Sequence, residues 1–128
     1  GVQHYEKVRN WLFGLIAKMA KRLEETPEGN GNMLDNTVIV YMSDAPDTHH
    51  STGFEWPLVL VGNLKGKMKL GGQYVNFPGY GKPGHRTVGC LYNSFLRSVG
   101  TEQETFGRID PDLDLQAMQT GPLAELMA

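Results

Sequence analysis

The chain has 128 residues, of which 40% are hydrophobic and 20% are charged. This is an ordinary globular composition, long enough for one domain or part of one, and it excludes an intrinsically disordered protein. The formal net charge is −2 and the basic residues are scattered, which argues against a nucleic-acid-binding surface. No apolar run approaches the ~18 residues of a membrane-spanning helix, and no signal peptide is visible.

Residues 4–25 are predicted to form an amphipathic helix. Apolar residues recur there at three- and four-residue spacing, and most charged residues lie off that stripe. Pro27 and the glycines at 29 and 31 are expected to end the helix. A helix face this apolar needs a sheet or another helix to cover it. The apolar residues are Val8, Trp11, Leu12, Phe13, Leu15, Ile16, Met19 and Leu23.

Two short apolar runs, residues 37–42 and 57–61, are predicted to be β-strands. The first is almost continuously β-branched or aromatic, which is typical of a strand buried on both faces. Residues 63–84 follow and are rich in glycine and lysine. We expect a long excursion there, with a short hairpin between residues 68–70 and 74–77. Its Gly-x-Gly pieces do not fit a phosphate-binding loop, which follows a strand and opens a helix.

A second helix is predicted over residues 88–99, started by Thr87 and ended by Gly100. Cys90, the only cysteine of the chain, falls on the apolar face of this helix. A single cysteine excludes an intrachain disulfide and a cysteine-based metal cluster, and we expect Cys90 to pack in the core. The tail from 101 begins with acidic residues, and residues 121–126 are expected to form a short docking turn or helix.

The order of elements predicts an α/β layered fold in which a small sheet is flanked by helices. Two or three strands make a small sheet, and the chain starts at Gly1 inside a helical pattern. We therefore interpret residues 1–128 as a single domain or a partial domain, with part of a larger sheet missing.

The residues most suited to chemistry lie in the loop between the two predicted strands. Carboxylates and imidazoles are natural ligands of zinc and related divalent metals, and a catalytic zinc needs about three protein ligands. Adjacent side chains seldom reach one metal, so we expect at most one histidine of the pair to be a direct ligand. The candidates are Asp44, Asp47, His49, His50 and Ser51, with Asp35 just ahead of the first strand.

Blander interpretations stay open for these residues. Asp, Pro, Thr and Ser are common turn formers, so on spacing alone we favour a solvated loop over a metal site. Ser51 and His50 are sequence neighbours, which rarely have the geometry of a nucleophile and its base, and no Gly-x-Ser-x-Gly elbow is present. His85 is either a further ligand or, as we favour, a residue at the start of the second helix. His4 is expected at the surface.

Several segments resemble the alkaline-phosphatase-like superfamily. The stretch from Glu24 to Asp44, with its Leu34-Asp-Asn-Thr37 start of a strand that ends in Ser-Asp, carries the first likeness. A Pro-Leu-Val-Leu-Val-Gly strand, a glycine-rich stretch and the helix at 91–100 follow in the same order. The chain is similar to the carboxyl-terminal part of uncharacterised bacterial proteins known by an HxxSHH motif, and to their sulfatase-like relatives. The likeness covers roughly residues 5 to 107.

The resemblance implies a metal-dependent hydrolase of phosphate or sulfate esters, exported or periplasmic, using zinc or manganese. Asp44 corresponds to a metal-binding aspartate, and His50 to a later metal-binding histidine, with His49 in reserve. Ala45 departs from the pattern, because a second histidine ligand stands there in the superfamily. The nucleophile and other ligands come from upstream segments, so this piece is expected to be inactive alone. The alternatives are a non-catalytic member with a degenerate site, or a small α/β binding domain.

Overall fold

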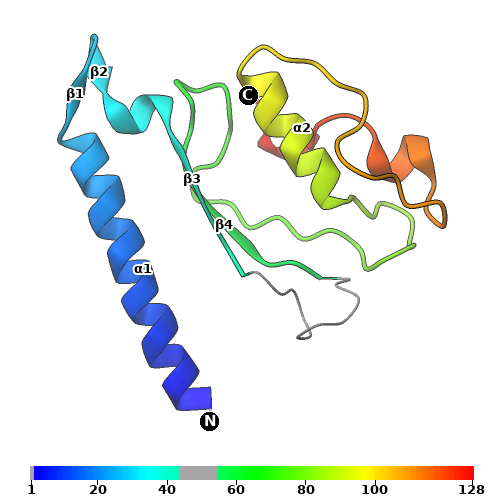
Figure 1. The fold of residues 1–128 in the computed structure, drawn as a ribbon, viewed down its shortest axis with the longest axis horizontal. Helices are drawn as coiled ribbons and strands as arrows, with labels where there is room; N and C mark the ends of the chain where they lie inside the picture. The colour runs from blue at the N-terminus through cyan, green and yellow to red at the C-terminus, as the bar shows by residue number, and fades with distance from the viewer. Residues whose placement is uncertain (1, 44–54) are drawn as a thin grey trace.

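A computed structural model describes residues 2–43 and 55–128 (Figure 1). The chain forms α1, then two short strands, the β3–β4 ladder, and α2 followed by a long C-terminal segment. The bounds are α1 Val2–Glu24, β1 Pro27–Glu28, β2 Gly31–Asn32, β3 Val38–Met42, β4 Leu58–Gly62 and α2 Val88–Ser98, with single turns η1 Met33–Asn36, η2 Leu115–Gln119 and η3 Ala124–Leu126. The mixed α/β class is therefore confirmed.

The first helix is confirmed. It begins two residues before its predicted start and ends one residue before its predicted end. It ends where expected, because β1 and β2 form a tight antiparallel pair around Gly29, whose φ is +59°. Asn32 and Asp35 then cap the η1 turn reciprocally. The Asp35 amide donates to Asn32 Oδ1 at 3.1 Å, and the Asn32 amide donates to Asp35 Oδ2 at 2.9 Å. This capping fixes the direction in which β3 begins.

The two predicted strands pair with each other as an antiparallel ladder. The register runs from Val38 opposite Gly62 to Met42 opposite Leu58. The expectation that the first strand is buried on both faces is wrong. Within β3 only Ile39 is fully buried, whereas Val40 keeps 39% of its surface exposed. The physical reason is that the described part of this sheet has only two strands, so β3 is an edge strand.

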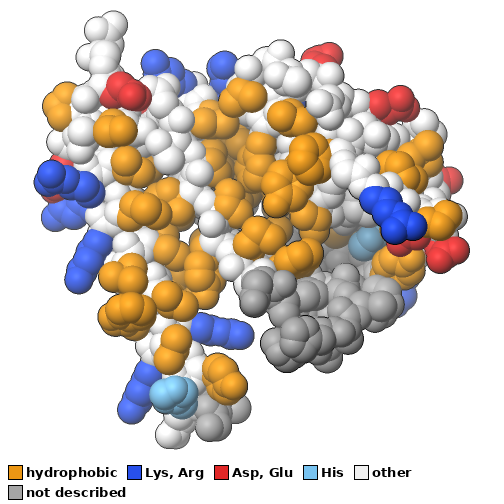
Figure 2. All heavy atoms as spheres, viewed as in Figure 1, with side chains coloured by type: hydrophobic (Ala, Val, Ile, Leu, Met, Phe, Trp, Pro, Cys, Tyr) orange, Lys and Arg blue, Asp and Glu red, His pale blue; other side chains and the backbone are white. Residues whose placement is uncertain are grey.

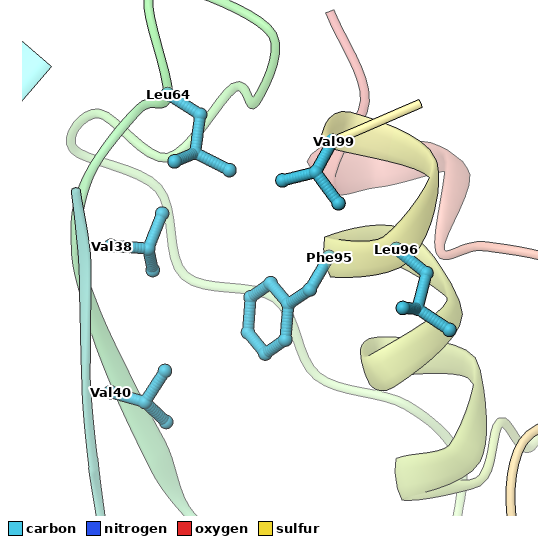
Figure 3. A pocket seen from close by; sticks show the side chains of 6 residues that line it. All are labelled: Val38, Val40, Leu64, Phe95, Leu96 and Val99. Atoms are coloured by element: carbon cyan, nitrogen blue, oxygen red, sulfur yellow. The ribbon is translucent and has the colours of Figure 1, made fainter. Parts of the chain in front are cut away.

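The ladder lies between the two helices (Figure 1). Neighbouring side chains of a strand point to opposite faces. On one face Tyr41 meets Phe13 of α1, with ring centroids 5.1 Å apart. On the other face Val38 and Val40 point toward Phe95 of α2 (Figure 3). The small sheet is thus flanked by helices, as the sequence predicts.

The core gathers on the α2 side of the ladder. Its fully buried members are Met68, Cys90, Leu91, Leu123 and Leu126, and half-buried side chains of both long strands pack against them. Cys90 is completely buried, so its predicted core position is confirmed. The predicted docking turn is also present, as η3, and its Leu126 closes this core.

The hairpin predicted within residues 68–77 is wrong. Met68 forms its bridge with Met127 instead, and the Lys69 amide donates to the Leu126 carbonyl at 2.8 Å. The extended segment therefore finds its backbone partners in the C-terminal residues. Gly71 and Gly72 then turn the chain away, with Gly72 at a φ of +65°.

Candidate functional site

The segment that carries the predicted metal ligands is held at both ends by the β3–β4 ladder. Met42 and Leu58 are opposite each other in the register, so Ser43 and Trp56 leave the same end of the ladder. The Trp56 indole Nε1 donates a 2.8 Å hydrogen bond to the Ser43 carbonyl oxygen. This hydrogen bond therefore links the residue that follows β3 to the residue near the start of β4.

Asp44, Asp47, His49, His50 and Ser51 lie outside the described residues, within 44–54. Asp35 is described and is not part of this end of the ladder. Its carboxylate caps η1, immediately before β3 begins, whereas Ser43 follows the end of β3. Within the described ranges 2–43 and 55–128, no three His, Cys, Asp or Glu side chains come together as a metal-binding group.

His85 packs just ahead of α2, as we favoured from the sequence. Its ring is buried, with 8% of the residue exposed, and its Nδ1 lies 2.9 Å from the Pro78 carbonyl oxygen. The ring of Tyr80 meets it edge-on, with centroids 5.8 Å apart. His85 therefore stabilises the turn that leads into Thr87, the residue that precedes α2.

Tyr80 and Asp110 join the glycine-rich segment to the C-terminal segment. The Tyr80 hydroxyl donates to Asp110 Oδ2 at 2.7 Å, and Asp110 Oδ1 accepts from the Asp112 amide at 2.9 Å. The hydrogen bond from Tyr80 lowers the pKa of the Asp110 carboxyl from its ordinary value, and the same bond raises the pKa of the Tyr80 hydroxyl. Tyr80 is exposed and Asp110 is half-buried, so this pair acts as a tether at the surface.

Arg86 is a structural residue that no sequence signal singled out. Its guanidinium donates to the carbonyl oxygens of Thr120 at 2.7 Å and Pro122 at 3.1 Å, with longer contacts to Ala117 and Gly121. Every residue has a backbone carbonyl, so the sequence does not show which carbonyl groups bind an arginine. A nearby acidic residue is the only partner that sequence reasoning could have suggested for Arg86. The contacts fix the C-terminal segment against the start of α2.

An apolar groove of about 270 Å³ lies between β3 and α2 (Figure 3). It is lined by Val38, Val40, Leu64, Phe95, Leu96 and Val99. None of these side chains can move a proton or bind a metal, so the groove offers contact area rather than acid–base chemistry. It lies beside β3, and no residue of β4 lines it.

Comparisons with protein-family models, with curated proteins and with solved structures found no match. Among the described residues, no helix is both long enough and apolar enough to cross a membrane.

Proposed function

We propose that this chain is the carboxyl-terminal segment of a metal-dependent hydrolase of phosphate or sulfate esters, of the alkaline-phosphatase-like kind. One observation carries the proposal beyond the sequence resemblance. The segment containing Asp44, His49 and His50 starts and ends at one end of a ladder flanked by helices. Loops that leave strand ends are where α/β proteins commonly place ligands.

The donor set fits a borderline divalent metal. Asp44 offers a carboxylate and His50 an imidazole, with His49 in reserve, and zinc and manganese both accept such ligands. When bound, the metal would act as a Lewis acid on the ester oxygens. Two ligands are fewer than the three that a catalytic zinc needs, and Ala45 adds none. The proposal therefore assigns the remaining ligands and the nucleophile to other parts of the complete protein.

Hydrolysis by the complete gene product tests this function. We expect it to cleave p-nitrophenyl phosphate or p-nitrophenyl sulfate, to lose the activity with a chelator, and to regain it with zinc or manganese. His50→Ala should reduce kcat/KM at least tenfold. The matched control is His4→Ala, which alters an exposed histidine near the start of α1.

The sequence offers one specific reason for a second candidate, a non-catalytic member of the same fold. Ala45 stands where the resemblance places a metal-binding histidine. Absence of any hydrolysis by the metal-loaded complete protein would contradict the first proposal and favour this one.

A further inference from the structure

The chain as a whole has more accessible surface than is expected of a folded monomer of its mass. Its accessible surface is 9049 Å². A folded monomer of 14.2 kDa is expected to expose about 6,800 Å². The excess of roughly 2,250 Å² is larger than the ~800 Å² that one partner buries in a standard interface. The exposed area of this chain is therefore large enough to form an interface with another polypeptide segment.

Part of the exposed surface is apolar and belongs to α1. Four large side chains, spaced three or four residues apart, form an exposed stripe. Their exposed fractions are 42% for Val8, 64% for Trp11, 41% for Leu15 and 47% for Met19. Figure 2 shows hydrophobic side chains along α1 and over the region between α1 and α2 in one view. Large contiguous apolar patches of this kind mark interaction sites.

Both helices contact β3, one on each face, and β3 has one edge that β4 does not occupy. Phe13 of α1 contacts Tyr41 on one face, and the groove on the other face lies between β3 and α2. Apolar side chains of the two helices therefore flank β3 on its two faces. Val40 and Val99 remain 39% and 62% exposed there.

We propose that a further β-strand, apolar on both faces, pairs with the free edge of β3 and fills the space between the two helices. This inference rests on the proposal that the chain belongs to a larger domain, which supplies the strand. An edge strand presents unpaired amide and carbonyl groups, which an added strand satisfies. A strand covered by helices on both sides must be apolar on both faces.

The charges on α1 argue against a second copy of this chain as the occupant. Lys7 lies four residues before Trp11 and Lys18 lies seven residues after it. Both lysines are therefore beside the stripe. In an antiparallel pair of copies packed stripe to stripe, Lys7 of one copy would lie near Lys18 of the other. The two positive charges would repel each other. A strand without basic residues avoids this repulsion.

Thiol labelling of the complete gene product tests the proposal. Leu15→Cys places a thiol in the stripe, and Ala17→Cys places one on an exposed position of α1 away from the stripe. We expect Leu15→Cys to react at least tenfold more slowly than Ala17→Cys in the complete protein. In a chain of residues 1–128 alone, the two should react at similar rates. Cys90 is fully buried and provides the unreactive background.

Hydrogen exchange of residues 38–42 identifies the occupant as a strand. The amides of this strand that point away from β4 should exchange at least tenfold more slowly in the complete protein than in residues 1–128 alone. Equal labelling of the two cysteines, or unchanged exchange, would overturn the inference. Concentration-dependent protection of Leu15→Cys in residues 1–128 would overturn it in favour of a second copy. Metal content reports on the proposed function separately, because neither cysteine variant lies at the proposed ligands.

Discussion

The indole nitrogen of Trp56 and the carbonyl oxygen of Ser43 are joined by a hydrogen bond of 2.8 Å. These residues follow the end of β3 and precede the start of β4, and thirteen positions separate them in the sequence. The bond therefore extends the β3–β4 ladder by one cross-connection beyond its last pair, Met42 and Leu58. It constrains where the proposed metal-binding segment begins and ends.

Trp56→Phe keeps an aromatic ring and removes the donor of this bond. We expect the free energy of unfolding to fall by about 0.5–1.5 kcal/mol, the usual net value of one hydrogen bond. Urea denaturation followed by circular dichroism measures the change. Trp11→Phe is the matched control in residues 1–128, since Trp11 is 64% exposed and should tolerate the change. An equal loss in the two variants would contradict the account.

Ser94 and Ser98 make a matched pair on the buried side of α2. Ser94 Oγ accepts a 2.8 Å hydrogen bond from the Leu123 amide and donates to the Cys90 carbonyl oxygen. Ser98 Oγ only donates to the Ser94 carbonyl oxygen. Ser94→Ala should cost about 1–3 kcal/mol, because it leaves the Leu123 amide buried without an acceptor, whereas Ser98→Ala should cost clearly less. The reverse order in denaturant melts would show that the Leu123 contact is unimportant.

Arg86→Lys should loosen the C-terminal segment. Lysine keeps the charge but lacks the planar guanidinium group, which lets arginine donate to several carbonyl oxygens at once. We expect a loss of about 1.5–3 kcal/mol and faster hydrogen exchange across residues 115–126. Arg97→Lys is the control, because Arg97 is half exposed and pairs with Glu102 at 3.7 Å on the surface. Unchanged exchange in Arg86→Lys would refute the anchoring role.

The Tyr80–Asp110 bond predicts a pH-dependent contribution to stability. The folded state lowers the pKa of Asp110 below its ordinary value of 3.8, so stabilisation is present above that pH and lost as pH falls through the lowered pKa. The pKa of Tyr80 is raised above 10.0, so stabilisation there is lost as pH rises through the raised pKa. Wild type should therefore exceed Tyr80→Phe in stability near pH 7. A difference that stays constant down to pH 2 would contradict this linkage.

Local patterns predicted the elements of this chain well. The apolar spacing of α1, the β-branched run from Val38 and the stripe of α2 each reflect a short-range period that sequence displays directly. The core position of Cys90 was also predicted correctly. Its buried neighbours at helical spacing, Asn93 and Ser94, are polar, so the position of Cys90 rests on the burial tendency of cysteine and on the apolar Leu91 beside it.

The failures concern contacts between distant parts of the chain. The bridge from Met68 to Met127 and the contacts from Arg86 to backbone carbonyl oxygens depend on where the C-terminal segment returns. No local pattern encodes that return. The exposure of Val40 was not predicted. A continuous apolar run is typical of a strand that is buried on both faces, but the run does not show whether neighbouring strands are present. The positions of Asp44, His49 and His50 relative to one another stay a prediction.

The metal content of the complete gene product tests the central claim most directly. Elemental analysis of the purified protein should find zinc or manganese near one equivalent or more. Asp44→Ala should lose at least nine-tenths of it, while Asp47→Ala, from the same segment, should retain it. Full metal content in Asp44→Ala, or no divalent metal in the unmodified protein, would contradict the assignment of this segment as part of a metal site.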